Sequence, residues 1–358
     1  MSERPVMILA GGTGGHIFPA LAVAEVLQER GVPVVWMGTR AGLEARVIPA
    51  AGIPIEWLDV QGLRRKGLGG WVRAPFMLMR STAQAVAAMR RHRPRAVLGM
   101  GGYVTGPGAL ACRLLGVPLL LHEQNAIAGF TNRKLMRFAQ RVMTGFDGVF
   151  AGAKVETTGN PVRRAIAALP EPTARRRPGQ RLRLLVLGGS QGAAALNDTV
   201  PAALAQLERA LKPEVWHQAG VRGLEDAKHA YRQHGLDDAR VTAFIDDMAQ
   251  AYAWADLAIA RAGALTVAEL SSAGVPAILV PYPFAVDDHQ TANARALVER
   301  DAAVLMPQDH LTPERLANVL RELLGDPDHL LTMAGHAREL GHPEAAQRVA
   351  ELCLEAGR

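Results

Sequence analysis

Short apolar runs that end in glycine-rich turns recur along the chain, and a helical pattern of apolar positions follows them. The run Val6–Ala10 leads into a turn at residues 11–16, after which a helical pattern covers residues 19–30. The run at 96–100 leads into the turn 101–106 in the same way. Strands that alternate with helices of this length are typical of a parallel sheet covered on both faces. The first half is therefore predicted to be an α/β domain, with further strands at 32–37 and 117–121.

The same pattern restarts in the second half, after a break at residues 170–179 that is rich in proline and charge. Residues 182–187 form an apolar run that leads into the glycine turn 188–192, and a helix is predicted at 264–273. Ligands of such sheets bind outside the carboxyl ends of the strands. The glycine turns are therefore expected on one side of each sheet, facing a cleft between two domains. Further strands are predicted at 215–218, 241–244, 257–260 and 277–280.

The three glycine turns are candidate anion sites. Glycine lets the backbone approach a ligand closely, and the start of the following helix offers unpaired N–H groups and the positive end of a dipole. A single turn of this kind often serves geometry alone, whereas three in one chain favour diphosphate chemistry. The standard fingerprints are missing, because no Walker-type motif occurs and Ile17 stands where a dinucleotide fold needs its third glycine. An ATPase and a dehydrogenase are therefore disfavoured.

Charge is divided unevenly along the chain, whose net charge is +6. Residues 1–160 hold 19 Lys+Arg against 9 Asp+Glu, a balance of +10, and the remainder holds 21 against 25, a balance of −4. A basic half suggests an anionic partner, and nucleic acid, an anionic membrane and a phosphorylated substrate all qualify, as does an ordinary solvated surface. The few aromatics and the glycine turns speak against nucleic acid. Cys112 and Cys353 lie in apolar stretches, which predicts buried reduced thiols and no zinc site.

Residues 62–80 mix basic and large apolar side chains, in the sequence GLRRKGLGGWVRAPFMLMR. Such a segment can lie on an anionic bilayer surface, although its apolar side chains can equally pack a helix onto the domain. No secretory signal and no apolar segment long enough to span a bilayer is found in the sequence. The chain is therefore expected to remain in the cytoplasm.

Eight segments of the sequence, in order and spread over nearly its whole length, resemble the motifs of the MurG family. They are GGTGGHIFPALAVA at 11–24, VLGMGGYVTGP at 97–107, LHEQNAIAG at 121–129, GNPVR at 159–163, VLGGSQGA at 186–193, FIDDMAQAYAWADL at 244–257, RAGALTVAEL at 261–270 and DDHQTANA at 287–294. Most are too long to match by chance. Some members of the family carry Gln where this chain has His289, so His289 is left out of the expected site.

The resemblance implies an α/β fold of the GT-B type, with two Rossmann-like domains whose parallel sheets face a deep cleft. It assigns residues 1–162 to an acceptor and membrane-side domain and 163–340 to a UDP-sugar domain, with a C-terminal helix in 341–358 that packs back near the first domain. It also implies an inverting transferase without metal or cofactor, which moves N-acetylglucosamine from UDP-N-acetylglucosamine to the C4 hydroxyl of lipid I (undecaprenyl-pyrophosphoryl-N-acetylmuramyl-pentapeptide), giving lipid II for peptidoglycan synthesis. The enzyme would be peripheral, at the cytoplasmic face of the inner membrane, with partners among the cell-wall synthesis and division proteins.

The family's contacts with the donor are carried over residue by residue onto the matching motifs. The backbone of Ile245 is expected to bind uracil, and the serine of the third glycine turn is Ser190. The full set expected to bind UDP-N-acetylglucosamine is Thr13, Gly14, Gly15, Asn125, Arg163, Ser190, Ile245, Ala264, Leu265, Thr266, Val267, Ala268, Glu269 and Gln290.

Inverting sugar transfer needs a base for the attacking hydroxyl and a stabilised diphosphate leaving group. His16 closes the first glycine turn and is the first candidate base, with a second reading in which it caps the helix or binds the acceptor diphosphate. Glu123 and His122 are its rivals, and the sequence leaves the choice between the three open. Arg163 is the expected cation for the leaving diphosphate, and Glu269 the acceptor for the ribose hydroxyls.

Two pairs of adjacent aspartates, at 246–247 and 287–288, are predicted to cap loops rather than to bind a metal. Adjacent side chains on a strand or helix point in different directions. Neither pair has the D-x-D spacing of metal-dependent transferases.

Overall fold

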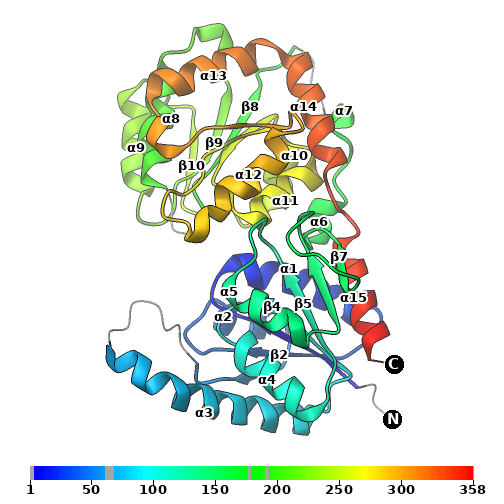
Figure 1. Cartoon of the computed structure of the whole chain (residues 1–358). Helices are drawn as coiled ribbons and strands as arrows, with labels where there is room; N and C mark the ends of the chain where they lie inside the picture. The colour runs from blue at the N-terminus through cyan, green and yellow to red at the C-terminus, as the bar shows by residue number, and fades with distance from the viewer. Residues whose placement is uncertain (1–3, 61–67, 176–178, 190–192, 358) are drawn as a thin grey trace. The chain divides into compact units, whose positions relative to one another are not determined.

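The computed structural model describes residues 4–60, 68–175, 179–189 and 193–357, without the side chains of 68–73 and 286. The chain divides into two compact units, which are shown in Figure 1. Unit 1 comprises Met1–Arg163 together with Pro343–Arg358, and unit 2 comprises Arg164–His342. The two units are described separately below.

The described residues of unit 1 form a seven-stranded sheet in the order β3-β2-β1-β4-β5-β6-β7, in which all neighbouring strands are parallel. Alternate residues of the central strand β1 contribute to two different cores. Val6 and Ile8 lie in one hydrophobic cluster, and Met7 and Leu9 lie in the other. Successive side chains of a strand point to opposite faces, so an entirely apolar strand is buried on both. The strands are β1 Val6–Ala10, β2 Val34–Gly38, β3 Ile55–Trp57, β4 Ala96–Gly101, β5 Leu119–Glu123, β6 Arg141–Thr144 and β7 Val155–Thr157.

Helices cover both faces of this sheet, and the last helix of the chain is one of them. Helix α15 packs against α1 and β4, and its Arg348 makes a bidentate ion pair with Glu156 on β7, at 2.6 and 3.0 Å. Val349 and Cys353 of α15 are buried in the same cluster as Val6. The helices of unit 1 are α1 Gly14–Glu29, α2 Glu44–Ala50, α3 Leu68–His92, α4 Thr105–Leu115, α5 Phe130–Leu135, η1 Met136–Phe138 and α15 Ala345–Ala356.

The described residues of unit 2 form a six-stranded parallel sheet in the order β10-β9-β8-β11-β12-β13. The strands are β8 Arg183–Leu187, β9 Glu214–Gln218, β10 Arg240–Thr242, β11 Leu257–Ala260, β12 Ala277–Leu279 and β13 Ala303–Leu305. The helices are α6 Arg164–Ala167, α7 Pro172–Arg175, α8 Ala194–Ala205, η2 Arg209–Leu211, α9 Leu224–Gln233, α10 Met248–Trp254, α11 Ala264–Ala273, η3 Val286–Asp288, α12 His289–Val298, η4 Gln308–His310, α13 Pro313–Gly325 and α14 Pro327–Glu339.

The predicted fold class of two α/β domains with parallel sheets is confirmed, and one local prediction is wrong. The first helix begins at Gly14 instead of residue 19, because Thr13 is extended and caps the helix, which places the end of the glycine turn in its first turn. The segment 170–179 is not only an exposed loop. Its residues 172–175 form α7, and the Arg175 guanidinium donates hydrogen bonds to the carbonyls of Tyr252, Ala273 and Gly274. None of the helices among the described residues combines the length and apolarity that crossing a bilayer requires.

Candidate functional site

The first glycine turn joins β1 to α1 and presents unpaired amides. Thr13 is extended (φ −115°, ψ 158°), and its carbonyl accepts hydrogen bonds from the amides of His16 and Ile17, at 3.1 and 3.3 Å. Among the described residues, no protein group accepts a hydrogen bond from the amides of Thr13, Gly14 and Gly15. These three donors lie at the positive end of a 16-residue helix, which makes the turn a candidate anion site.

The second glycine turn, after β4, lies directly against the first. A Cβ atom on Gly102 would lie 2.3 Å from the carbonyl oxygen of Gly11, and one on Gly101 would lie 2.7 Å from Cδ2 of His16. Both residues have positive φ angles, of 85° and 112°. Only glycine fits at these two positions. The close approach places the half-buried imidazole of His16 between the two turns, at the carboxyl edge of β1 and β4.

Glu123, a rival base, uses both carboxylate oxygens to hold the loop that follows β5. Oε1 accepts hydrogen bonds from the amide and side chain of Asn125 at 3.1 and 3.3 Å. Oε2 accepts hydrogen bonds from the Gly129 amide at 3.0 Å and from Asn132 Nδ2 at 2.9 Å. The side chain is 3% exposed. Glu123 therefore acts as a fixed acceptor that orients Asn125, and this occupancy disfavours it as a base.

His122, the other rival, is completely buried with both ring nitrogens engaged. Nε2 lies 3.0 Å from the Gly159 carbonyl oxygen, and Nδ1 lies 3.3 Å from Nε2 of Gln124. Burial lowers the pKa of His122 to about 4, against smaller raising effects of the Gly159 carbonyl and the Glu123 charge. A neutral imidazole with its Nε2–H on a carbonyl cannot reach a substrate hydroxyl, so His122 is a structural residue.

Two buried histidines are expected to make the fold sensitive to acid. Burial also lowers the pKa of His217 on β9, to about 3, and its Nδ1 lies 3.0 Å from the Tyr231 hydroxyl. A histidine with a lowered folded-state pKa binds fewer protons when folded. Its stabilising contribution is therefore complete above pH ~6.5 and is lost as the pH falls toward the folded-state pKa. When the pH falls from 7.5 to 5.5, the lowered pKa of His122 and that of His217 should each decrease the free energy of unfolding by about 1 kcal/mol.

Urea unfolding of His217→Gln at these two pH values checks this prediction, because the variant should lose less stability than the parent protein does. The matched control is His229→Gln on α9, an exposed histidine whose removal should leave the pH dependence unchanged. If His217→Gln lost as much stability as the parent protein between these pH values, His217 would not contribute to the acid sensitivity.

Arg163 lies beside helix α1, although the two are far apart in sequence. Its guanidinium carbon is 5.6 Å from the ring centroid of Phe18, two residues beyond His16. A cation–π contact of this kind restrains the side chain. The structure thus places Arg163 in the same unit as the first glycine turn and as Asn125.

Several residues predicted to bind the donor lie in unit 2, on helices α11 and α12 and in the loop before α10, and α11 packs against both α10 and α12. Helix α11 begins at Ala264 after an extended Gly263, so Ala264 to Ala268 present the start of this helix. Glu269 is not a surface residue: it is 5% exposed, and its Oε2 accepts a hydrogen bond from the Tyr252 hydroxyl on α10 at 3.1 Å. Leu265, Thr266 and Val267 complete the segment, whereas Ser190 lies outside the described residues.

The two other predicted donor residues of unit 2 flank α11. Ile245 is buried in the loop after β10 and just before α10, and Gln290 is the second residue of α12. Oε1 of Gln290 accepts a hydrogen bond from the Tyr282 amide at 2.8 Å. Because α10 and α12 both pack against α11, the fold groups Ile245 and Gln290 with Glu269 at the carboxyl edge of this sheet.

Two side chains that hold these loops were missed by the sequence reasoning. Arg261 donates hydrogen bonds to the carbonyls of Val280 and Pro281, both at 3.2 Å, and to Gln308 Oε1 at 2.6 Å. Asn293 on α12 donates a hydrogen bond to the Ala262 carbonyl at 3.2 Å and is completely buried. Both residues lie within segments that resemble motifs of the MurG family, and this resemblance could have identified them. Only the structure shows that they connect the loops after β11 and β12.

The aspartate pairs serve local structure. Asp247 caps α10 by accepting a hydrogen bond from the Gln250 amide at 2.9 Å, and Asp288 accepts one from the Thr291 hydroxyl at 2.7 Å. In the part of the chain that the structure describes, no three His, Cys, Asp or Glu side chains are grouped so that they could hold a metal ion.

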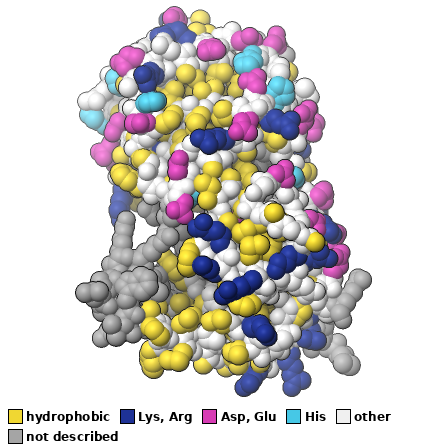
Figure 2. Space-filling model, in the orientation of Figure 1, with side chains coloured by type: hydrophobic (Ala, Val, Ile, Leu, Met, Phe, Trp, Pro, Cys, Tyr) yellow, Lys and Arg dark blue, Asp and Glu magenta, His cyan; other side chains and the backbone are white. Residues whose placement is uncertain are grey.

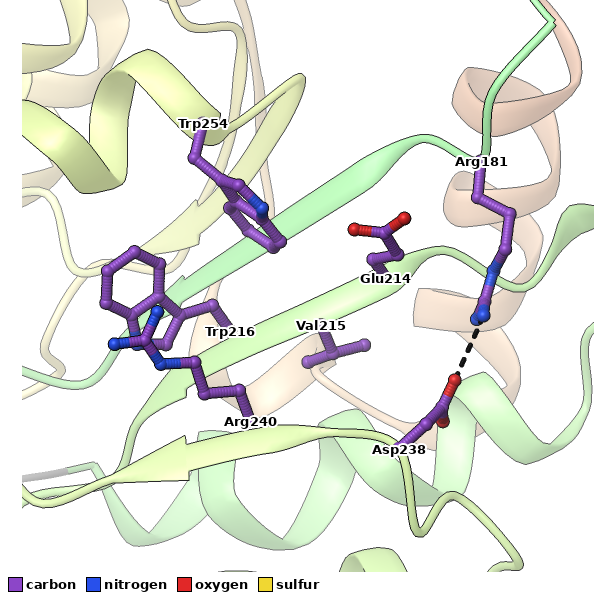
Figure 3. A pocket seen from close by; sticks show the side chains of 7 residues that line it. All are labelled: Arg181, Glu214, Val215, Trp216, Asp238, Arg240 and Trp254. Carbon is purple, nitrogen blue, oxygen red and sulfur yellow. Dashed lines mark hydrogen bonds and ion pairs between the residues drawn. The ribbon is translucent and has the colours of Figure 1, made fainter.

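A cavity of about 370 Å³ lies at the opposite, amino-terminal edge of the unit 2 sheet. Figure 3 shows the Arg240 guanidinium over the Trp216 ring, at 3.7 Å from its centroid, with Trp254 edge-on at 5.7 Å. An ion pair between Arg181 and Asp238 closes its other side. The cavity lies where β9 and β10 begin, and none of the residues that line it belongs to the predicted site.

Two family models match the chain. The model of the glycosyltransferase family 28 N-terminal domain matches residues 6–144, and that of the glycosyltransferase family 28 C-terminal domain matches residues 183–349. Together they cover most of the chain: the first lies within unit 1, and the second covers most of unit 2 and the start of α15.

Full-length relatives are similar to the chain from end to end. A protein of Alkalilimnicola ehrlichii is 61% identical over 355 residues, which are 99% of each chain. A protein of Halorhodospira halophila is 56% identical over 357 residues, again 99% of each chain. Both are named UDP-N-acetylglucosamine–N-acetylmuramyl-(pentapeptide) pyrophosphoryl-undecaprenol N-acetylglucosamine transferase.

The fold is also that of a solved MurG. The crystal structure of Acinetobacter baumannii MurG matches with a TM-score of 0.84 and 42% identity, over 98% of this chain and 99% of that one. UDP-N-acetylglucosamine 2-epimerase of Neisseria meningitidis has a TM-score of 0.65 at 12% identity, which shows a shared fold alone. On these matches and the arrangement of its glycine turns, the chain belongs to glycosyltransferase family 28 and, within it, to the MurG family.

Proposed function

We propose that the chain transfers N-acetylglucosamine from UDP-N-acetylglucosamine to the C4 hydroxyl of the N-acetylmuramyl sugar of lipid I, with inversion, to give lipid II for peptidoglycan synthesis. The observation that carries this proposal is the name shared by relatives of 56 to 61% identity over essentially the whole chain. Both substrates carry diphosphates, which fits a chain whose sheets end in glycine turns.

The donor is proposed to bind through unit 2. The backbone at Ile245 contacts uracil, and the start of α11 offers amides to the diphosphate. Glu269 is assigned to the ribose hydroxyls, and this assignment is supported by its burial and by the hydrogen bond from Tyr252, which restrains the carboxylate. Gln290 is assigned to the sugar, and the Tyr282 amide restrains its side-chain oxygen.

His16 is proposed as the general base that removes the proton from the attacking hydroxyl. Its half-buried imidazole lies between the two glycine turns of unit 1, whereas Glu123 is occupied by the loop after β5 and His122 by the Gly159 carbonyl. A neutral imidazole can accept the proton of a hydroxyl. The oxygen of the acceptor then attacks C1 of the donor sugar, and UDP departs with the bonding electron pair.

The negative charge that develops on UDP is proposed to be stabilised by Arg163 and by backbone amides. A guanidinium can bind two phosphate oxygens at once. The amides at the start of α11 are pre-oriented donors, so they need no reorganisation as charge develops. No metal or cofactor is assigned to any step.

A basic and apolar surface of unit 1 is proposed to dock on the anionic cytoplasmic face of the inner membrane. Phe76 and Met79 of α3 are 68% and 65% exposed, whereas residues 62–67 of the predicted patch lie outside the described residues. Two further exposed aromatic side chains, Phe130 and Phe138, were not predicted from the sequence. Lys134 lies over the ring of Phe130, and Arg137 lies over the ring of Phe138. Helix α4 packs against both α3 and α5, and Figure 2 shows apolar and basic side chains side by side on this unit.

The double replacement of Phe76 and Met79 by serine should weaken binding to anionic liposomes, because insertion of large apolar side chains adds to the attraction of basic residues. Each lost apolar side chain should cost about 1 kcal/mol or more, which predicts a drop in affinity of at least about tenfold for the pair. Sedimentation with phosphatidylglycerol vesicles measures it. Val221→Ser, which removes a 77% exposed side chain from unit 2, is the matched control. Equal binding of the folded double variant and the control would show that this surface of α3 does not dock on the membrane.

The function is tested by incubating the protein with UDP-N-acetylglucosamine and a short-chain lipid I analogue and measuring UDP release. Release that depends on the acceptor and persists in a metal chelator is the expected result. UDP binding without acceptor-dependent release would keep the donor and reject lipid I as the acceptor. Release of products from the donor alone would indicate epimerase chemistry instead. Proteins of cell-wall synthesis and division are the proposed partners at the membrane.

A further inference from the structure

A completely buried carboxylate lies beneath the first glycine turn. Glu44, the first residue of α2, is 0% exposed. Its Oε2 accepts a hydrogen bond from the Gly12 amide at 3.1 Å. Its Oε1 accepts hydrogen bonds from the amide and the hydroxyl of Thr39 at 3.0 and 2.7 Å. Glu44 thus connects the turn after β1 to the turn after β2, which is the neighbouring strand in the sheet.

Three glycines make room for this side chain. A Cβ atom on Gly42 would lie 2.0 Å from Oε2 of Glu44, one on Gly11 would lie 2.7 Å from Oε1, and one on Gly38 would lie 2.8 Å from Cγ. Side chains at these positions would displace the carboxylate. Burying a carboxylate is costly, and among the described residues no cation forms an ion pair with Glu44. Packing alone does not explain a buried glutamate at this position.

The reason lies in the direction of the turn's amides. Gly12 has a φ of +94°, and its N–H points inward to Glu44. The next three amides, of Thr13, Gly14 and Gly15, have no protein acceptor among the described residues. The hydrogen bond from the Gly12 amide to Glu44 therefore fixes the conformation of the turn. It thereby also fixes the direction of the next three amides and of the His16 imidazole.

We propose that Glu44 is a positioning residue, whose buried carboxylate locks Gly12 so that the amides of Thr13 to Gly15 bind a substrate diphosphate. The inference rests on the proposed function for the identity of the substrate. The bound diphosphate is that of the donor or that of the acceptor, and the experiment separates them.

The test replaces Glu44 by glutamine, which keeps the size of the side chain. A glutamine oxygen can still accept both hydrogen bonds from Thr39, but its NH2 group then faces the Gly12 amide, donor against donor. We expect kcat/KM for transfer to fall at least about tenfold, because the amides of Thr13 to Gly15 are no longer held in place for a diphosphate. A rise in KM for UDP-N-acetylglucosamine alone places the donor diphosphate at the turn, and a rise for the lipid I analogue alone places the acceptor diphosphate there.

The matched control is Glu56→Gln on β3 of the same sheet, which removes a carboxylate that binds Arg91 and His92 at the surface. It should keep wild-type kinetics. A Glu44→Gln protein that folds and keeps full kcat/KM for both substrates would overturn the proposal.

A second measurement depends neither on catalysis nor on the stability of a variant. In the unaltered protein, the Gly12 amide should exchange with solvent at least about tenfold more slowly than the Gly14 amide, because it is bonded to a buried carboxylate. Inorganic pyrophosphate should shift the amide resonances of Thr13 to Gly15 and leave Gly12 nearly unmoved. Equal exchange of Gly12 and Gly14, or no response to pyrophosphate, would refute the positioning role even if transfer to lipid I were established. Transfer to some other acceptor would leave both observations intact.

Discussion

Replacing His16 by alanine is expected to lower kcat by about 10²- to 10⁴-fold, the range that a positioned general base contributes. The expectation follows from the place of the imidazole between the two glycine turns of unit 1 and from the engagement of its rivals, His122 and Glu123. UDP affinity should stay near that of the unaltered protein, because the residues assigned to uridine lie in unit 2. The measurement is steady-state transfer to a lipid I analogue, with UDP binding determined by calorimetry.

The pH dependence distinguishes a base from a structural role for His16. In the unaltered protein, kcat/KM should fall as the pH drops below the imidazole's range, because the protonated ring cannot accept the proton of the hydroxyl. This acidic limb should vanish in His16→Ala. His229→Ala, at an exposed position on α9, should keep both the rate and the limb. An acidic limb that persists in His16→Ala would assign the base elsewhere.

Replacing Glu269 by alanine is expected to weaken UDP binding about 100-fold. Hydrogen bonds to a charged acceptor contribute roughly 1.5 to 3 kcal/mol each, and the carboxylate is assigned two ribose hydroxyls. The side chain is 5% exposed, so water replaces it poorly. Calorimetry with UDP and with its 2′,3′-dideoxy analogue measures the effect: the unaltered protein should prefer UDP strongly, and Glu269→Ala should bind both ligands alike.

The alanine variant also removes the acceptor of the Tyr252 hydroxyl, so Tyr252→Phe is the matched control. Phenylalanine breaks that hydrogen bond and leaves the carboxylate in place. We expect only a small loss of affinity in Tyr252→Phe, with the preference for UDP retained. If the two variants weaken UDP to the same extent, Glu269 serves the packing of α10 on α11 instead of the ribose.

Much of the fold could be predicted from the sequence, because the signals that specify it are local. The uniformly apolar run Val6–Ala10, buried on both faces, required a central parallel strand, and each glycine turn marked the carboxyl end of such a strand. The motifs that carry the family resemblance are likewise short and continuous. Where the local reading failed, as for the start of α1, capping by the extended Thr13 decided the boundary.

The choice among the three candidate bases could not be made from the sequence. His16 follows the glycine turn after β1, and His122 and Glu123 end β5, so their local surroundings in the sequence suit a catalytic group equally well. Only the fold shows that the Gly159 carbonyl and the Asn132 side chain engage two of them. Such partners come from other strands and helices, and hydrogen bonds between distant segments leave no periodic pattern in a sequence.

The sequence by itself therefore determined two α/β halves, their glycine turns and the family, because strand alternation and turn chemistry act over a few residues. The tertiary structure decided how individual side chains are used. In the folded protein Arg163 contacts Phe18, and α15 packs on the sheet of unit 1. Glu44 is buried beneath Gly12, although the two are 32 residues apart in sequence. The physical reason is that burial and hydrogen bonding depend on which segments meet in space, and a carboxylate such as that of Glu44 looks like any surface glutamate until the glycines around it are in place.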